Sequence, residues 1–120
     1  SSFKTGLQSI SKDVKGILLL PVDYPLVQEN TINALIWYFF KNNPMILVPS
    51  FNGSKGHPPI FSALLRDELA ILENDKGLNT ILHTYQNETT ILPLEDPGII
   101  TSFNTQAEFE ALILPKSNFI

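Results

Sequence analysis

The strongest constraint on the fold is a continuous apolar run at residues 16–22, Gly-Ile-Leu-Leu-Leu-Pro-Val, which is followed by Asp23 and Pro25. An apolar run without polar alternation predicts a strand that is buried on both faces, as in the sheets of α/β proteins. Ligands of such sheets bind beyond the carboxyl ends of the strands. We therefore predict an α/β fold in which Asp23 lies at the ligand-binding edge.

Length and composition exclude several classes of protein. A chain of 120 residues predicts a single domain over residues 1–120. The net charge of −4 and the scattered Lys and Arg residues argue against a nucleic-acid partner. The absence of cysteine excludes disulfides, thiolate zinc sites and a Cys nucleophile. No run is long enough to span a membrane and no signal-peptide pattern opens the sequence, so we expect a cytoplasmic protein without a membrane partner.

Apolar spacing predicts helices and strands in alternation. Helices are expected over residues 2–11, 29–42, 63–72, from Asp75 onward, and from a capping box at 105–108 to about Ile113. Strands are expected over residues 16–22, 45–48 and 89–94, with a short extended piece at 98–103. A helix between the first two strands makes a parallel crossover the default connection. We therefore expect a sheet that is parallel at its centre.

Four short segments occur in a recognisable order. They are Asp-Tyr-Pro at 23–25, Gly-His-Pro at 56–58, Asn-Asp-Lys-Gly at 74–77 and Ser-Phe-Asn-Thr at 102–105. This series resembles the Asp-x-Pro, Gly-His-Pro, Gly-Asp-x-Gly and Asp-Ile-Asp-Thr motifs of the MobA-like family, the molybdenum cofactor nucleotidyltransferases. The order and spacing agree with the family from Ser2 to about Leu112.

The resemblance implies a Rossmann-like, three-layer nucleotide-diphospho-sugar transferase fold. It also implies a role in molybdenum cofactor biosynthesis, in which CMP or GMP moves from a nucleoside triphosphate to a phosphorylated acceptor such as molybdopterin. A phosphate nucleophile is already ionised, so this chemistry requires alignment and charge stabilisation, which magnesium supplies. By resemblance, Asp23 is the catalytic residue and a metal ligand, and Asn104 is the second metal ligand. The substrate-binding residues implied are Pro25, Gly56, His57 and Pro58.

The sequence departs from the family pattern at three places, one of which is Gly77-Leu78-Asn79, where the family has Gly-Ala-Arg and therefore a cationic contact that is missing here. Ser102 and Asn104 replace both aspartates of Asp-Ile-Asp-Thr, so we expect magnesium binding to be weak or absent in this chain. The family's glycine-rich phosphate loop has no counterpart, because the six glycines are dispersed. The chain therefore resembles the C-terminal portion of a MobA-like domain and is expected to be inactive alone. The alternative is a degenerate, non-catalytic α/β module for binding or assembly.

Each candidate residue also has a purely structural interpretation. Asp23 could accept hydrogen bonds within a turn, and His57 could be bonded only to backbone. Asn104 precedes a predicted helix, and a role at the helix entrance is favoured over metal binding. In the family fold the strand at 16–22 lies beside a first strand that this sequence lacks. An open apolar edge is therefore expected, with a homodimer or a missing N-terminal half as its partner.

Overall fold

The structure is a computed structural model, which describes residues 14–21, 26–71, 75–101 and 109–115. The predicted helix at 2–11, the capping box at 105–108 and three candidate site residues, Asp23, Pro25 and Asn104, lie outside these ranges. The described elements are β1 (Val14–Pro21), α2 (Glu29–Asn42), β2 (Ile46–Phe51), β3 (Ser54–Lys55), β4 (Ile60–Ser62), η1 (Ala63–Leu65), α3 (Arg66–Ala70), α4 (Asp75–Thr84), η2 (Gln86–Glu88), β5 (Thr89–Pro93), η3 (Pro97–Ile100) and β6 (Phe109–Pro115).

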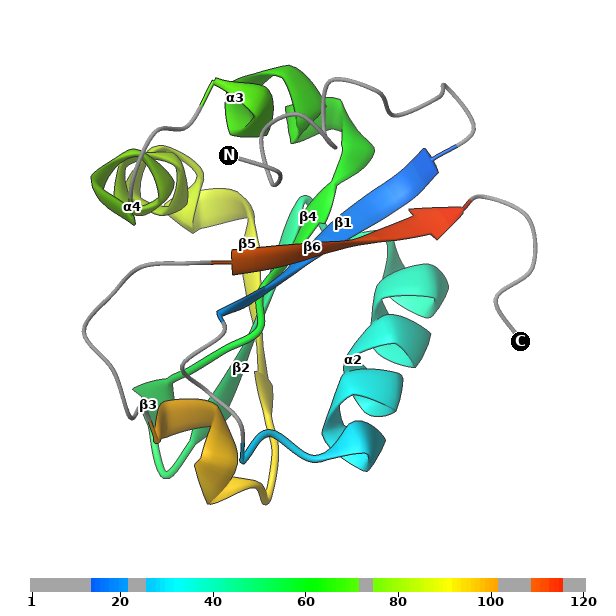
Figure 1. Cartoon of the computed structure of the whole chain (residues 1–120). Helices are drawn as coiled ribbons and strands as arrows, with labels where there is room; N and C mark the ends of the chain where they lie inside the picture. The colour runs from blue at the N-terminus through cyan, green and yellow to red at the C-terminus, as the bar shows by residue number, and fades with distance from the viewer. Residues whose placement is uncertain (1–13, 22–25, 72–74, 102–108, 116–120) are drawn as a thin grey trace.

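The strands form one mixed sheet of six strands in the order β3-β2-β4-β1-β6, with β5 paired to β2 (Figure 1). β4 is antiparallel to both β1 and β2, whereas β5 is parallel to β2. The expectation of a parallel centre is therefore wrong, because β4 returns from β2 through a hairpin and separates β2 from β1. β1, β2 and β5 nevertheless run in one direction, so their carboxyl ends meet at one edge of the sheet, which we call the carboxyl edge.

Helix α2 has the residue bounds that the sequence predicts, Glu29–Asn42. It ends where Asn43 adopts the left-handed conformation and donates its backbone N–H to the Phe39 carbonyl at 2.9 Å. Phe39 packs on β1 because Gly16 has no side chain, since a Cβ at that position would lie 2.6 Å from the phenyl ring. The apolar stripe of α2 thus covers one face of the sheet.

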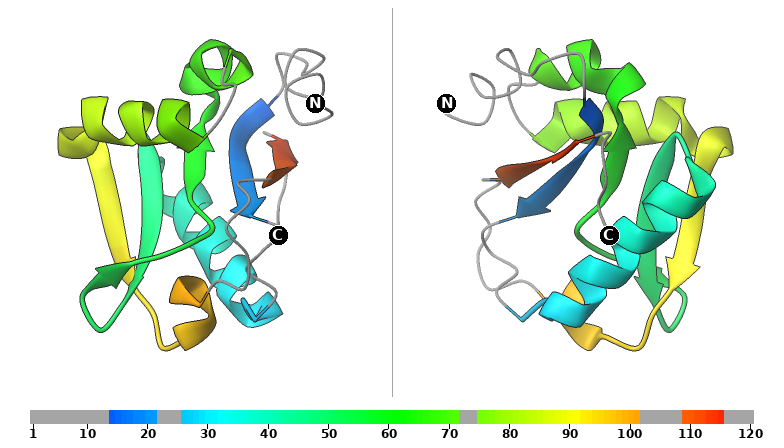
Figure 2. Two further views of the ribbon diagram at one scale, coloured as in Figure 1. Left: turned by 60° about the vertical axis from the view of Figure 1, so that its left-hand side comes forward. Right: turned by 90° about the vertical axis from the view of Figure 1, so that its right-hand side faces the viewer.

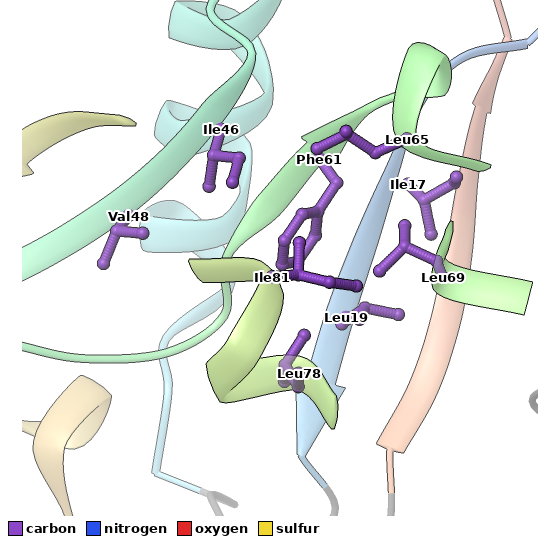
Figure 3. Packing of buried hydrophobic residues seen from close by; sticks show 9 residues of the cluster. All are labelled: Ile17, Leu19, Ile46, Val48, Phe61, Leu65, Leu69, Leu78 and Ile81. Carbon is purple, nitrogen blue, oxygen red and sulfur yellow. The ribbon is translucent and has the colours of Figure 1, made fainter. Parts of the chain in front are cut away.

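The sheet is covered by helices on both faces, which gives three layers (Figure 2). Along β1, Leu18 belongs to the α2 side, whereas Ile17 and Leu19 face η1, α3 and α4. The cluster on this second side consists of Ile17, Leu19, Ile46, Val48, Phe61, Leu65, Leu69, Leu78 and Ile81 (Figure 3). Side chains that alternate between two apolar layers explain why the β1 sequence has no polar alternation.

The C-terminal helix expected up to Ile113 is a strand from residue 109 onward. β6 runs antiparallel along β1 from Val14↔Pro115 to Pro21↔Phe109. The helix prediction failed for a physical reason, because periodicity does not distinguish a short apolar run in a strand from one in a helix. The pairing with β6 also means that β1 has a neighbouring strand on both sides, β4 on one and β6 on the other. The open edge from which we expected dimerisation is therefore absent at this strand.

A second correction concerns residues 98–100, which belong to the 3-10 helix η3 and not to an extended piece. Asp96 caps this helix by accepting a hydrogen bond from the Gly98 N–H, and proline occupies its first turn. An Asp-Pro pair is a helix-start signal, because the side chain caps the amides and proline has a preset backbone angle. Within the described ranges, no helix has the length and apolar character required to cross a membrane.

Candidate functional site

Segments that are far apart in the sequence meet at the carboxyl edge. The β2–β3 hairpin, η3 and the start of α2 gather at the lower end of the molecule in Figure 1, and both views of Figure 2 agree. β1 also ends there, at Pro21, two residues before Asp23 in the sequence. This edge therefore contains the Gly-His-Pro motif and the described residues nearest in sequence to the Asp-x-Pro motif.

The Gly-His-Pro motif lies in a bulge of a β-hairpin. Leu47 of β2 pairs with Ile60 on one side, and Ser50 pairs with Lys55 on the other. Two residues of β2 thus face the four residues 56–59, which we call the bulge. A bulge of this kind re-aims side chains at the edge of a sheet and is common near functional sites.

Prolines and three backbone hydrogen bonds define the bulge. Pro58 and Pro59 have no amide hydrogen and cannot donate to a strand ladder. The Gly56 N–H donates to the Pro49 carbonyl at 2.8 Å, and the Leu19 N–H of β1 donates to the Pro59 carbonyl at 3.0 Å. The bulge is consequently attached to both β2 and β1.

The third hydrogen bond connects the bulge to η3. The His57 N–H donates to the Ile99 carbonyl at 2.8 Å. A Cβ at Gly56 would lie only 2.5 Å from the same oxygen, so glycine is required for this close approach. On the other side of η3, a Cβ at Gly98 would lie 2.2 Å from the Leu26 carbonyl oxygen. The η3 segment is therefore held between Leu26 and the bulge.

His57 is the residue of the Gly-His-Pro motif that retains access to solvent. Its side chain is half-buried and its Nδ1 atom is shielded from solvent, whereas Gly56 and Pro58 are buried. The preceding Lys55 is exposed on β3, as expected of a solvated charge. His57 is therefore the residue of this motif that remains partly exposed at the carboxyl edge, while its two buried neighbours shape the backbone around it.

Asp96 is a buried acid at the same edge that the sequence prediction missed. Its side chain is 2 % exposed. Oδ2 accepts hydrogen bonds from the Gln28 N–H at 2.9 Å and the Thr31 hydroxyl at 2.7 Å, and Oδ1 accepts one from the Gly98 N–H at 2.9 Å. Burial raises the pKa of Asp96, but these three hydrogen bonds outweigh it and lower the pKa below the ordinary aspartate value. The Asp96-Pro97-Gly98 triplet, which is typical of a helix start, is the sequence signal that could have identified Asp96 as a capping residue.

Comparison with known proteins identifies the family. Residues 1–90 match the MobA-like NTP transferase domain. The chain belongs to this family. A comparison with curated proteins gives no significant match.

Solved structures share part of this fold. The chain is similar to Rv0371c of Mycobacterium tuberculosis H37Rv in complex with manganese, with 27% identity and a TM-score of 0.67 over 79% of this chain and 50% of that chain. A second structure of Rv0371c gives the same values over 48% of its length. The homologue from Mycobacterium sp. strain JC1 shares the fold at 23% identity and a TM-score of 0.67, with 79% of this chain and 47% of that chain covered. This MobA-like chain thus spans about half the length of these relatives.

The residues with metal-binding side chains are spread over the described part of this MobA-like domain. No group of three His, Asp or Glu side chains with metal-binding geometry occurs in it. The two oxygens of Asp96 accept three hydrogen bonds from the protein, so this carboxylate has a structural role at the start of α2 and η3. The same carboxylate lies at the start of α2, where a phosphate would otherwise interact with the helix dipole. Asp23 and Asn104, the predicted ligands, lie outside the described residues.

Proposed function

We propose that this MobA-like chain forms the acceptor side of a nucleotidyltransferase. In this proposal CMP or GMP moves from a nucleoside triphosphate to a phosphorylated acceptor such as molybdopterin. The observation that carries the proposal is the presentation of half-buried His57 at the carboxyl edge, next to the end of β1. Family membership over residues 1–90 supports the same conclusion.

The residues have separate tasks in this reaction. Asp23 lies two residues beyond the end of β1 in the sequence and would hold a divalent cation, with the Asn104 carbonyl oxygen as a second ligand, because hard cations select oxygen ligands. The cation supplies charge stabilisation for the phosphate groups. His57 would orient the acceptor phosphate by donating a hydrogen bond from its imidazole, which makes it a binding residue and not a base. The carboxylate of Asp96 keeps its hydrogen bonds to two backbone amides and the Thr31 hydroxyl throughout.

A relative supports the requirement for a divalent cation. Rv0371c has been solved in complex with manganese. Magnesium and manganese both favour carboxylate and carbonyl oxygens, so the Asp23 and Asn104 pair suits either ion. This chain offers one carboxylate, that of Asp23, whereas a standard family member offers three. Its affinity for the divalent cation should therefore be lower than that of a standard family member.

The first experiment tests for the cation site. The free Mn²⁺ signal in electron paramagnetic resonance is followed while the chain is titrated with Mn²⁺. We expect D23N to weaken Mn²⁺ binding by about 10-fold or more, since a charged ligand is lost. The matched control is D67N, a change at an exposed aspartate of α3, which should leave the affinity unchanged. A wild-type chain that binds no Mn²⁺ would favour a non-catalytic α/β module.

The second experiment tests the acceptor site with a pterin phosphate monoester. H57Q should weaken binding of this ester in calorimetry, whereas H83Q, at an exposed position of α4, should not. Equal affinities for the two variants would remove His57 from the proposal. The 120 residues contain no glycine-rich phosphate loop, so we expect no pyrophosphate release from CTP or GTP with Mg²⁺. Measurable release would contradict the assignment of this chain to the acceptor side alone.

A further inference from the structure

We propose that Asn52 is a site of spontaneous covalent modification, at which the side-chain amide is converted to a carboxylate with loss of ammonia. Asn52 and Gly53 are exposed and form the tip of the β2–β3 hairpin at the carboxyl edge (Figure 1). The reaction uses only the chain itself and water, so it does not depend on the proposed transferase function. It makes the carboxyl edge more acidic as the protein ages.

The reaction starts at the backbone nitrogen of Gly53. After losing its proton, this nitrogen attacks Cγ, the carbonyl carbon of the Asn52 side chain, and forms a five-membered imide ring. The bond from Cγ to the side-chain nitrogen breaks, and that nitrogen takes up the released proton and leaves as ammonia. Water then opens the ring at one of its two carbonyl groups, which gives either aspartate or isoaspartate.

Gly53 presents an accessible nucleophile. Glycine has no side chain to hinder the approach of its own nitrogen to Cγ. Apart from its neighbours in the chain, no described atom lies within 4 Å of the point where a Gly53 Cβ would be, so the ring has space to form. Among the described residues, the Gly53 N–H donates no hydrogen bond that ring closure would have to break.

A second asparagine shows why the following residue decides the outcome. Asn43 has nearly the backbone conformation of Asn52, with a φ of 50° against 51°. The residue after Asn43 is Pro44, whose nitrogen has no proton to lose and cannot form the imide. The Asn43 side chain also accepts a hydrogen bond from Lys15. Conformation alone therefore does not select the modified residue.

The other described asparagines are followed by amides that have a structural task. Asn87 is exposed like Asn52, but the next N–H, that of Glu88, donates to the Tyr85 carbonyl at 2.9 Å. Inside a helix the following N–H is committed to the helical hydrogen bonds or to the first turn. This applies to Asn30, Asn33, Asn42 and Asn79, which lie in α2 and α4.

The hairpin is also weakly held at its tip. The imide ring fixes the rotation about the Asn52 Cα–C bond, so the turn has to open before the ring closes. β3 consists of two exposed residues. Short, exposed pairing opens locally at low free-energy cost. β3 is paired to β2 only through Ser50↔Lys55 and Phe51↔Ser54.

Both products carry a new negative charge but differ in their effect on the turn. Aspartate tolerates the left-handed conformation and keeps the hairpin. Isoaspartate adds a carbon to the main chain at the tip and disrupts the Phe51↔Ser54 pair next to it. The new carboxylate also repels an anion at the carboxyl edge. This last consequence alone rests on the proposed function, in which the acceptor is a phosphate ester.

The test follows the whole chain during incubation in mildly alkaline buffer, by ion-exchange chromatography and peptide mass spectrometry. We expect a more acidic form to accumulate, with NH₂ replaced by OH at Asn52, and to accept a methyl group from an isoaspartate methyltransferase. N52Q should not form it, since its longer side chain would need a six-membered ring. Asn43 and Asn87 are the internal controls and should convert several-fold more slowly.

Two results would overturn the inference. One is conversion at Asn43 or Asn87 that is as fast as at Asn52. The other is an unmodified Asn52 after a free peptide of residues 50–55 has been converted in the same buffer.

A binding measurement tests the effect of the charge. N52D should weaken binding of the pterin phosphate monoester by about 2-fold, the scale of an interaction between exposed charges. N87D is the matched control, because it adds the same charge in η2, before the start of β5 and away from the carboxyl edge. Equal affinities of N52D and wild type would contradict the charge effect. A wild-type chain that does not bind the ester would refute the proposed function, while the mass spectra would still decide the modification.

Discussion

The carboxyl edge and the apolar cluster between the sheet and α3–α4 are stabilised in different ways. The cluster combines nine buried side chains from six elements, and its contacts are non-directional. The edge depends on a few directional contacts, namely the hydrogen bonds of Asp96 and the backbone approaches at Gly56 and Gly98. The difference indicates that volume-conserving changes are tolerated in the cluster, whereas the edge is sensitive to single atoms.

The largest effect is expected from emptying the cluster. Phe61 is fully buried, so F61A should lower the free energy of unfolding by about 4 kcal/mol through lost burial and a cavity. The measurement is urea denaturation. W37A is the control, because Trp37 is 64% exposed on α2 and its removal should cost far less. Equal losses for the two variants would contradict the assignment of Phe61 to the core.

At the edge, one methyl group should have a large effect. G98A places a Cβ 2.2 Å from the Leu26 carbonyl oxygen, so the backbone must shift, at a cost of about 2 kcal/mol or more. G53A is the comparison, because Gly53 has open space but a φ of +81°. Its cost should be about 1 kcal/mol, from the left-handed conformation alone. A smaller loss for G98A than for G53A would show that Leu26 and η3 are not in rigid contact.

The contrast between the two regions also explains what the sequence could predict. The apolar stripe of α2 gave its bounds, because a helix of that length repeats its pattern several times. The run at 109–115 was too short for this, and only pairing with β1 decides that it is a strand. The edge was not predictable in the same way, because the contact of Gly98 with Leu26 joins backbones that are distant in sequence. The roles of Asp23 and Asn104 stay predictions.

Acidification should remove the contribution of the Asp96 carboxylate to the stability of the carboxyl edge. D96N removes a charged acceptor of three hydrogen bonds and should cost about 1.5 kcal/mol at neutral pH. Burial raises the pKa of Asp96 but the hydrogen bonds lower it further, to below the ordinary value of 3.8. The contribution of the carboxylate is therefore complete above pH 3.8 or so and is lost as the pH falls through the folded-state pKa.

Unfolding of wild type and D96N at a series of pH values checks this expectation. The difference in unfolding free energy should be constant from neutral pH down to mildly acidic pH and should then shrink with further acidification. The same series on F61A should show no such change relative to wild type, because no titratable group is removed. A wild-type advantage that grows on acidification would contradict the direction of the pKa shift.

The smallest effect is expected at the opposite end of the sheet. The Ser62 hydroxyl accepts a hydrogen bond from the Leu64 N–H at 3.2 Å and caps η1 in an exposed position. S62A should cost about 0.5 kcal/mol in urea denaturation, the low end for an exposed cap. A loss of unfolding free energy as large as that of D96N would mean that polar contacts at the two ends of the sheet contribute equally to stability.

The bulge has a consequence for protein engineering. Residues on both sides of it, in β3 and β4, pair with β2 independently, so the strand registers do not depend on how many residues join them. A sequence grafted between Lys55 and Ile60 should keep glycine at position 56 and the backbone hydrogen bonds of residues 56, 57 and 59, while the side chain at position 57 is varied to change what is offered to a small molecule. Changes in this hairpin could thereby alter ligand selectivity while the rest of the fold stays the same.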